Sequence, residues 1–493
     1  MSPDVLIIGY GPTGATLAAR LGQLGVKTLI IDREHEIYPL PRAAHFDHEI
    51  MRVWQRLGIA AAVEPQTRAI STYDFVNAQG QSLMRFESPA RTLSGWQASY
   101  MFHQPGIEAA LRNVVAQSAD VQVETGVTFL DVISNDETGA TVSVMDGNGT
   151  RNIRTRYVIA CDGASSPVRK ALGIPQFDYG FDEPWLVVDV MTKGDDSRLP
   201  QHGIQHCVPA RPTTYMPMSP GRYRWEFMLK RGEVPADMMD DSRVMALLAP
   251  WHGLAEFTLG RKAVYRFHGL VAREWRKGNV LLAGDAAHQT PPFMGQGLCS
   301  GVRDAENLGW KLAEIFAGRA ADTLLGTYQP EREPHVRAMI ETAIFMGRVV
   351  CIQDEAEAAK RDRDMLAAPV AKGSTPTIPP APALKGGQFT ETPLAGTLAA
   401  QTVRHEGGAT QRSDDHWPQG FVYAGFGDAA RKARAHLPAH VAIMDLEVDP
   451  WGAALAAQLS EAGVQGALIR PDRYILGTGP AANLWPARTT EAA

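Results

Sequence analysis

Residues 5–14 read Val-Leu-Ile-Ile-Gly-Tyr-Gly-Pro-Thr-Gly, and this stretch decides the fold. The apolar run at 5–8 predicts a buried parallel strand, and a helical pattern opens directly after the glycines. A second apolar run at 27–31 ends at Asp32, about twenty residues beyond the glycines. Strand, glycine-rich turn, helix, strand and acid at this spacing predict the βαβ unit of a dinucleotide-binding Rossmann domain.

Each glycine of the motif has a separate physical task. Gly9 permits a tight turn, Gly11 lets a pyrophosphate approach the backbone, and Gly14 lets the helix pack closely on the strand. The free N–H groups and the positive dipole end of the helix attract phosphates. Asp32 can accept hydrogen bonds from a ribose diol. A glycine-rich turn in some other α/β protein is the plainer interpretation of the same residues.

Length and composition limit the remaining possibilities. A chain of 493 residues is long enough for roughly two to four domains. Its 45% hydrophobic and 21% charged residues are typical of a soluble globular protein. A net charge of −6 disfavours nucleic acid or an anionic membrane as a partner. No apolar run reaches the ~20 residues of a membrane span.

The cysteines and the N-terminus bear on the compartment. The four cysteines are far apart and form no CxxC pair, which disfavours a disulfide framework and a metal site. The first strand begins too early to leave room for a signal peptide. The sequence therefore predicts a cytoplasmic protein in a reducing environment.

Two further turns combine glycine with an acidic residue. Asp162 and Gly163 follow a buried strand and precede a helix start, and alone they fit a capped strand–helix junction equally well. Asp285 ends another buried strand, where a carboxylate can hold a ribityl hydroxyl. The loop that follows can bring backbone N–H groups against a flat polar ring, and it contains Pro292, Gly295 and Gly297.

The three motifs, in this order and at these separations, resemble the class A flavoprotein aromatic hydroxylases, which are single-component FAD monooxygenases. The resemblance spans roughly residues 3–345. Within that class, residues 38–47, 205–212 and 224–229 look like the 3-(3-hydroxyphenyl)propionate hydroxylases. The segment after residue 400 resembles the thioredoxin-like C-terminal domain of many such enzymes. It lacks a CxxC pair, so a thiol redox role is not expected.

The resemblance implies an α/β chain of several parts, with a homodimer as a possible assembly. An FAD-binding Rossmann-like domain of the glutathione-reductase type carries an inserted substrate-binding sheet domain and is followed by a linker and a thioredoxin-like domain. The expected boundaries are 1–72, 97–183 and 268–345 for the FAD-binding domain, 73–96 and 184–267 for the substrate-binding domain, 346–400 for a helix and linker, and 401–493 for the thioredoxin-like domain.

The same resemblance assigns residues to the cofactors FAD and NADH (or NADPH). Asp285 is expected to bind the ribityl chain, and Gln104 to begin the helix beside the flavin. Asp162 and Gly163 match a fingerprint linked to both FAD and the nicotinamide cofactor. Because only one full GxGxxG is present, the nicotinamide cofactor is expected to bind transiently in a groove. The residues expected around FAD are Gly9, Gly11, Gly14, Asp32, Arg33, Arg42, Gln104, Asp162, Gly163, Asp285, Pro292, Gly295 and Gly297.

The chemistry that the resemblance implies is hydroxylation of a 3-hydroxyphenylpropionate-like acid. FAD reduced by NADH or NADPH would react with O2 to give a C4a-hydroperoxide whose distal oxygen attacks the ring. A base that ionises the phenol helps this attack. His45 is the candidate, since an unperturbed pKa near 6.5 suits proton acceptance at neutral pH, and Asp47 could orient it. His45 could equally cap the next helix or contact FAD alone.

A propionate-bearing phenol needs a cation and an aromatic surface. Arg211 and Arg224 are the candidate cations, and Tyr215 and Trp225 could stack on the ring. Solvated arginines and ordinary sheet core are the plainer interpretations of these four residues.

The alternative function is a polyketide or antibiotic tailoring FAD hydroxylase or epoxidase that acts on a polycyclic phenol. Such an enzyme would share every cofactor motif. A non-enzymatic FAD-binding protein is disfavoured by the three intact motifs.

Overall fold

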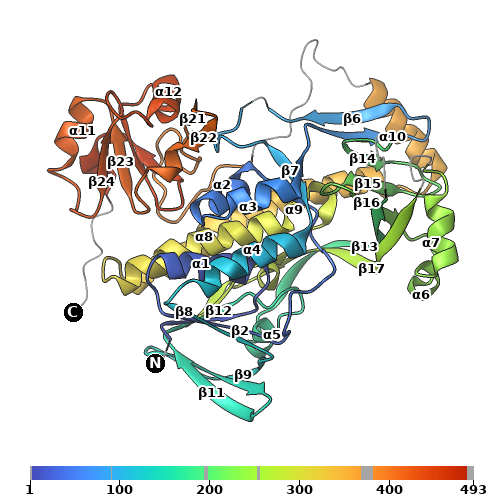
Figure 1. Ribbon diagram of the computed structural model, residues 1–493, viewed down its shortest axis with the longest axis horizontal. Helices are drawn as coiled ribbons and strands as arrows, with labels where there is room; N and C mark the ends of the chain where they lie inside the picture. Colours follow the sequence, from blue (N-terminus) through green and yellow to red (C-terminus); the bar gives the residue numbers. More distant parts are fainter. Residues whose placement is uncertain (1–2, 90, 194–197, 252–255, 368–380, 486–493) are drawn as a thin grey trace.

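The computed structural model describes residues 3–89, 91–193, 198–251, 256–367 and 381–485. The chain forms a mixed α/β fold with several sheets (Figure 1). The helix and linker expected at 346–400 lie partly outside the described residues, and the described part after the helix begins at residue 381. Residues 381–397 contain no helix or strand.

A six-stranded sheet in the order β18-β19-β12-β1-β2-β8 forms the base of the molecule. All neighbouring strands in it run parallel except β18 and β19. The strands are β1 (Val5–Ile8), β2 (Thr28–Asp32), β8 (Val121–Thr125), β12 (Tyr157–Ala160), β18 (Arg276–Lys277) and β19 (Val280–Leu282). Because both faces of a parallel sheet are covered, its strands are continuous apolar runs. The strands predicted at 5–8 and 27–31 are confirmed to within one residue.

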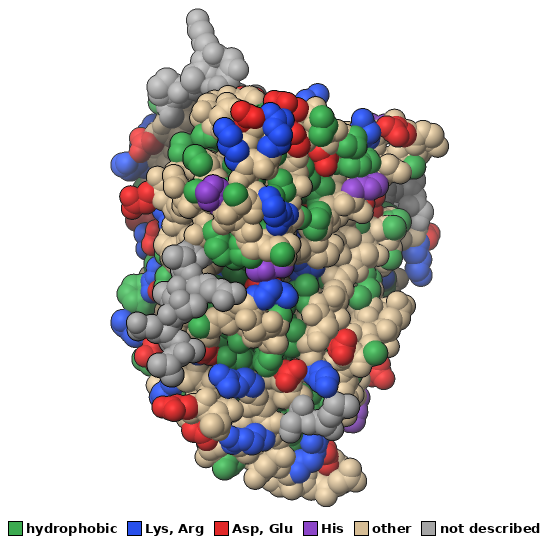
Figure 2. Space-filling model, turned by 90° about the vertical axis from the view of Figure 1, so that its left-hand side faces the viewer, with side chains coloured by type: hydrophobic (Ala, Val, Ile, Leu, Met, Phe, Trp, Pro, Cys, Tyr) green, Lys and Arg blue, Asp and Glu red, His purple; other side chains and the backbone are tan. Residues whose placement is uncertain are grey.

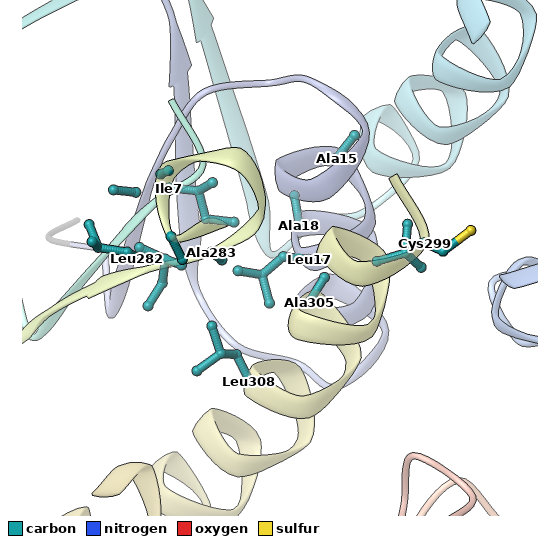
Figure 3. Packing of buried hydrophobic residues seen from close by; sticks show 14 of the residues in the cluster. Ile7, Ala15, Leu17, Ala18, Leu282, Ala283, Cys299, Ala305 and Leu308 are labelled. Atoms are coloured by element: carbon teal, nitrogen blue, oxygen red, sulfur yellow. The ribbon is translucent and has the colours of Figure 1, made fainter. Parts of the chain in front are cut away.

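Two helices cover one face of this sheet and pack on each other. They are α1 (Pro12–Gln23) and α8 (Gly297–Phe316). Figure 3 shows Leu17 and Ala18 of α1 beside Ala305 and Leu308 of α8, close to the strand residues. A Cβ atom on Gly301 would lie 2.3 Å from the Thr13 hydroxyl, so α8 can approach α1 this closely only with glycine there. This packing sets the start of α8 next to the glycine-rich loop.

The second large sheet has eight strands in the order β20-β17-β13-β16-β15-β14-β5-β6. Strands β5 and β6 form a hairpin, because they pair antiparallel. The long strands β13 and β17 connect this sheet to the rest of the molecule (Figure 1). The strands are β5 (Thr72–Val76), β6 (Ser82–Glu87), β13 (Gln176–Thr192), β14 (Gly203–His206), β15 (Thr213–Pro217), β16 (Arg222–Met228), β17 (Phe257–Ala272) and β20 (His288–Gln289).

Smaller sheets complete the N-terminal three quarters of the chain. One has the order β3-β7-β4 and the other β11-β10-β9. Their strands are β3 (His45–Asp47), β4 (Thr67–Ala69), β7 (Ser99–Phe102), β9 (Thr128–Asp136), β10 (Gly139–Asp146) and β11 (Gly149–Thr155). The remaining helices of this part are α2 (His48–Arg56), α3 (Ala60–Val63), α4 (Gln104–Ala116), α5 (Pro167–Ala171), α6 (Pro235–Met238), α7 (Asp241–Leu248), α9 (Tyr328–Val350) and α10 (Glu355–Ala367).

The C-terminal part contains a four-stranded sheet in the order β24-β23-β25-β26. Strand β23 is parallel to β24 and antiparallel to β25. In Figure 1 this part lies beside α2 and α8. Its elements are β21 (Val403–Glu406), β22 (Ala409–Arg412), β23 (Val422–Gly425), α11 (Asp428–Ala433), β24 (Ala442–Asp445), α12 (Ala453–Glu461), β25 (Gly466–Ile469) and β26 (Ile475–Thr478).

The surface agrees with a chain of small net charge. Figure 2 shows basic and acidic side chains interspersed on the face turned to the viewer, with hydrophobic ones between them. Within the described ranges, no helix combines the length and the apolar character that a membrane crossing needs.

Candidate flavin and substrate site

The glycine-rich loop leaves open space at the start of α1. Gly9 has φ +105°, and a Cβ there would lie 2.4 Å from the Cys161 carbonyl oxygen. A Cβ on Gly14 would lie 2.0 Å from the Gly9 carbonyl oxygen, so the fold itself requires both glycines. Gly11 is different, because a Cβ there would have no atom within 4 Å. The unpaired N–H groups of the first turn of α1 therefore face a space that a pyrophosphate can fill.

Asp32 ends β2 beside this loop. Its Oδ2 accepts a hydrogen bond from the Tyr10 backbone N–H at 2.5 Å, and its Oδ1 accepts one from the Glu34 N–H at 2.8 Å. The carboxylate thus fixes the turn that would surround the adenosine ribose. Arg33, expected at the adenine, has a mostly exposed side chain that pairs with Glu34 at 3.1 Å.

The Asp162–Gly163 turn follows β12. Gly163 has φ +82°, and a Cβ there would have no atom within 4 Å. Asp162 accepts a hydrogen bond from the Val168 N–H at 3.0 Å through Oδ2. Its Oδ1 is buried without a partner among the described protein groups, and burial raises the pKa of this carboxyl. A buried unpaired oxygen costs about 1–3 kcal/mol, so the turn suits a ligand that donates a hydrogen bond.

Asp285 lies in a turn at the end of β19. Its carboxylate is exposed and accepts no hydrogen bond from the described residues. Loss of hydration among the surrounding protein groups raises the pKa of Asp285, while the charges of His288 and then Arg42 lower it. The Arg42 guanidinium also lies 5.0 Å from the centre of the Tyr38 ring. Asp285 and Arg42, far apart in sequence, are thus close enough for their charges to interact, and their contact with FAD stays a prediction.

Gln104 begins α4 and fixes the chain at Arg42. Its Oε1 accepts hydrogen bonds from the Arg42 and Ala43 N–H groups at 2.9 and 2.8 Å. Its Nε2 donates to Glu108 at 2.7 Å. Gln104 therefore holds the loop that carries Arg42.

The loop expected at the flavin ring contains a short 3-10 turn (Pro292–Met294) and leads into α8. Gly295 has φ +63°, and a Cβ there would lie 2.6 Å from the Cβ of His45. A Cβ on Gly297 would meet no atom within 4 Å. The backbone of this loop is thus packed on His45 on one side and open on the other.

Both ring nitrogens of His45 are engaged. Nδ1 lies 3.3 Å from the Gly295 carbonyl oxygen and Nε2 lies 2.7 Å from the Ser99 hydroxyl. Since a carbonyl only accepts, Nδ1 carries the proton and Nε2 accepts from Ser99. Burial lowers the pKa of His45, so the ring is neutral at pH 7. His45 therefore contacts the flavin loop directly, and it does not cap the next helix.

Asp47 was expected to orient His45, but its hydrogen bonds go to α2 and to Arg303. It caps α2, with its Oδ1 accepting from the N–H groups of Glu49 and Ile50 at 3.1 and 3.3 Å. Its Oδ2 lies 2.6 Å from Arg303. Burial alone would raise the pKa of Asp47, but the Arg303 guanidinium holds it well below its usual range. The carboxylate is thus a permanent charge paired with α8.

The residues expected to bind the substrate separate onto two faces of the eight-stranded sheet. Tyr215 and Trp225 lie on its outer face, where their rings pack at 5.1 and 5.3 Å from Trp251 beneath α7. Both rings belong to the buried core of this face, so their position gives no support to the expectation that they stack on the substrate. Arg211 is held by Glu233 through two contacts of 2.6 Å and by a backbone carbonyl. Both terminal nitrogens of its guanidinium are therefore already engaged.

Arg224 lies on the inner face and ties the sheet to the flavin-side loop. It contacts Asp189 at 2.6 and 2.9 Å. It also donates to the carbonyl oxygens of Pro41 and Arg42 at 2.8 and 2.9 Å. Arg224 therefore sets the distance between the sheet and the Arg42 loop, and its charge is already balanced.

The inner face also carries residues that the sequence reasoning missed. Glu226 is buried, 3.9 Å from Arg224, and burial raises the pKa of its carboxyl to about 7. Beside it, Thr214 donates to Gln205, and Gln205 donates to the Tyr73 hydroxyl, both at 2.6 Å. Charged and aromatic residues alternate along 222–228. Because successive side chains of a strand point to opposite sides, this pattern predicts that the charged residues share one face of the sheet and the aromatic residues the other.

Arg261 on β17 belongs to the same face. It donates to the Pro41 carbonyl through Nη1, whereas its Nε and Nη2 are buried without a partner among the described residues. Burial, and then the charge of Arg224, lower the pKa of Arg261 to about 10. The inner face thus offers a titratable carboxyl and a partly unpaired guanidinium.

An open helix N-terminus and two glycine turns fit a dinucleotide-binding protein, and the second sheet contacts the Pro41–Arg42 loop through Arg224. Residues 2–343 match the family model described as the FAD binding domain. The chain belongs to this family, and FAD is its cofactor.

Two relatives connect this family to phenol hydroxylation. The probable NADH-specific resorcinol 4-hydroxylase of Rhodococcus jostii (strain RHA1) is 36% identical over 495 residues, covering 96% of this chain and 91% of the relative. The 3-(3-hydroxy-phenyl)propionate/3-hydroxycinnamic acid hydroxylase of Mycolicibacterium smegmatis is 36% identical over 361 residues, covering 73% of this chain and 63% of the relative. The protein is thus a flavoprotein hydroxylase.

Solved structures share the whole fold. Aklavinone-11 hydroxylase, in a ternary complex with FAD and aklavinone, is 21% identical and covers 97% of each chain with a TM-score of 0.78. The flavin-dependent monooxygenase PieE, in complex with FAD and substrate, is 22% identical and covers 98% of each chain, also with a TM-score of 0.78.

Proposed function

We propose that the protein hydroxylates a small phenol with a polar substituent meta to its hydroxyl, using NADH and O2. The names of both relatives describe a phenol of this pattern, since resorcinol and 3-(3-hydroxyphenyl)propionate are both 3-substituted phenols. Bound FAD supplies electron transfer from NADH and delivery of one oxygen atom from O2 to the ring. The residues of the chain hold the cofactor, orient the phenol and accept its proton.

The cofactor roles follow from the geometry of the loops. The first turn of α1 beside Gly11 is expected to bind the pyrophosphate, and Asp285 with Arg42 the ribityl side. The backbone at Gly295 and Gly297 is expected to line the ring. The open space beside Gly11 and Gly297, where a Cβ would meet no atom within 4 Å, supports these places for the pyrophosphate and the ring.

His45 remains our candidate for the base. Its Nε2 is unprotonated and accepts from the Ser99 hydroxyl at 2.7 Å. We propose that a phenol proton reaches Nε2 through this hydroxyl, and that the lowered pKa of His45 keeps the ring ready to accept it at neutral pH. A phenolate is a stronger nucleophile than a phenol, which favours attack on the electrophilic oxygen.

The charges on the inner face of the eight-stranded sheet indicate which substituent of the phenol the site favours. Arg211 and Arg224 are already paired with Glu233 and Asp189, so neither offers a free cation for a propionate. Glu226 is a buried carboxyl without a hydrogen-bonding partner among the described residues, and it can accept a hydrogen bond from a second hydroxyl. This arrangement favours an uncharged dihydroxybenzene.

A 3-hydroxyphenyl carboxylic acid is the second candidate, and Arg261 supports it. Its Nε and Nη2 are buried and unpaired within the described part of the chain, so they could hold a carboxylate. A polycyclic phenol is less well supported, because only the fold is shared with aklavinone-11 hydroxylase.

One set of assays decides between these substrates. NADH oxidation is measured with resorcinol, 3-(3-hydroxyphenyl)propionate and a polycyclic phenol, and the products are identified by mass. The variants are Glu226→Gln and Arg261→Met, with Arg266→Met as the control, because Arg266 lies on the same strand but is exposed and paired with Asp182.

We expect Glu226→Gln to raise the KM for resorcinol about 5-fold, because a neutral amide oxygen is a weaker acceptor than a carboxylate by about 1 kcal/mol. Arg261→Met and the control are expected to leave it nearly unchanged. Stimulation by the carboxylic acid alone, lost in Arg261→Met, would establish the second candidate. Stimulation by polycyclic phenols alone would refute both.

We also propose the division of the chain into the FAD-binding parts 1–72, 97–183 and 268–345, the substrate-binding parts 73–96 and 184–267, the connecting segment 346–400 and a thioredoxin-like part at 401–493. The mixed strand order β24-β23-β25-β26 supports the last assignment.

A further inference from the structure

The turn between β25 and β26 is buried, which is unusual for a connection between two strands. It comprises residues 470–474, Arg-Pro-Asp-Arg-Tyr, and leaves the C-terminal sheet toward α2, α8 and α9. Arg470 contacts Glu331 at 2.9 Å, and Asp472 accepts from the Trp310 indole at 3.0 Å. The C-terminal part therefore contacts α8 and α9 through this turn.

A chain of buried polar contacts leads from this turn to the flavin loop. The Tyr474 hydroxyl donates to Glu49 at 2.5 Å, and the other oxygen of Glu49 lies 2.6 Å from Nε of Arg303. Arg303 contacts Asp47 at 2.6 Å and Gln296 at 3.1 Å through its two terminal nitrogens. Nε2 of Gln296 returns to Asp47 at 3.2 Å.

The two ends of this chain of contacts lie in the site. Gln296 stands between Gly295 and Gly297, whose backbone faces the flavin ring in the proposed function. Asp47 lies two residues from His45 on β3, and His45 contacts the Gly295 carbonyl. Arg303 therefore joins the strand of the candidate base to the cofactor loop, and Glu49 holds Arg303.

We propose that Tyr474 is a positioning residue, which acts through Glu49 and Arg303 to hold the flavin loop and the His45 strand in register. Without its hydroxyl, one oxygen of Glu49 is left buried and unpaired, and such a group moves to find a partner. A shift of Glu49 moves Arg303 and both groups that it holds. The C-terminal part thus completes the active site although none of its residues needs to touch the substrate.

The test compares Tyr474→Phe with Tyr423→Phe. Tyr423 is a fully buried tyrosine of the same C-terminal part whose hydroxyl donates to the Gly479 carbonyl at 3.0 Å, away from the flavin loop. Both variants remove one buried hydroxyl. A structural role alone predicts similar changes in both.

We expect both variants to bind one FAD per chain and to melt within a few degrees of the parent. Tyr474→Phe alone should shift the visible spectrum of bound FAD and lower product formed per NADH at least about 2-fold, with an unchanged KM for NADH. Glu49→Gln, which breaks the chain of contacts from the other side, should give the same spectral shift, and the double variant should add little to it.

An unaltered flavin spectrum and parent-like coupling in Tyr474→Phe would overturn the proposal. If Tyr474→Phe does not fold, Glu49→Gln decides with the same readouts. The proposal rests on the proposed function for the place of the 295–297 backbone at the flavin ring and for the substrate assay. The flavin spectrum is recorded without substrate, so a wrong substrate and a wrong role for Tyr474 give different results.

Discussion

Replacement of Gly11 by leucine is expected to prevent FAD binding while the fold persists. Gly11 has φ −77° and ψ −173°, a conformation that any residue adopts, and a Cβ there would meet no atom within 4 Å. The free energy of unfolding of the apoprotein should therefore change by no more than about 0.5 kcal/mol. A leucine side chain would occupy the place of the pyrophosphate at the helix N-terminus.

The loss of FAD affinity should be large. Hydrogen bonds to a charged group contribute about 1.5–3 kcal/mol each. The loss of one or two of them weakens binding by at least about 10- to 100-fold. Titration of apoprotein with FAD, followed by flavin fluorescence, measures the affinity, and urea unfolding without FAD measures the stability.

Gly14→Ala is the matched control. A Cβ at that position would lie 2.0 Å from the Gly9 carbonyl oxygen, so this smaller change should destabilise the apoprotein itself. Gly11→Leu with parent-like FAD affinity and an intact fold would refute the assignment of the pyrophosphate to this loop.

Three further changes test other parts of the account. His45→Ala should lower product per NADH more than FAD content, with partial recovery at high pH, where the phenol ionises unaided; unchanged coupling near pH 7 would exclude His45 as the base. Gly295→Ala, at φ +63° and with a Cβ 2.6 Å from that of His45, should lower FAD content, as absorbance per chain would show. Burial raises the pKa of Glu331, but Arg470 and then Lys311 lower it to about 2. Ionised Glu331 should add about 3 kcal/mol to the free energy of unfolding above pH ~4.3, and this contribution should be lost as the pH falls through about 2. Urea unfolding midpoints from pH 5 to 2 test this, and the midpoint of Glu331→Gln should fall less steeply with decreasing pH.

The parts of the fold that could be predicted depend on local chemistry. The strand at 5–8, the glycine turn and the second strand follow from residues that are close in sequence, and only glycine suits the contacts at Gly9 and Gly14. The Asp285 turn could be recognised for the same reason. Local sequence fixes a turn because the steric limits of its backbone act within a few residues.

The substrate face could not be assigned so directly. Trp225 and Glu226 are neighbours in sequence but lie on opposite faces of β16, and composition alone favoured the aromatic residue. Which face meets the cofactor depends on how the sheet packs, as shown by the contact of Arg224 with the Pro41 carbonyl. An alternating pattern gives two faces without saying which one is functional.

The contacts that tie the site together lie even further apart in sequence. Tyr474 and Glu49 are separated by 425 residues, and Arg303 and Asp47 by 256. Neither pair follows a helical or strand period. Such pairs become visible only when the C-terminal turn is placed against α2 and α8.

The most direct test of the central claim is the fate of the oxygen atoms of O2. The holoenzyme is supplied with NADH, resorcinol or 3-(3-hydroxyphenyl)propionate, and oxygen-18 gas, and the product is analysed by mass. The account predicts that one labelled oxygen atom enters the aromatic product and that NADH oxidation depends on the phenol. An unlabelled product, or NADH oxidation that yields only hydrogen peroxide with every phenol tested, would contradict it.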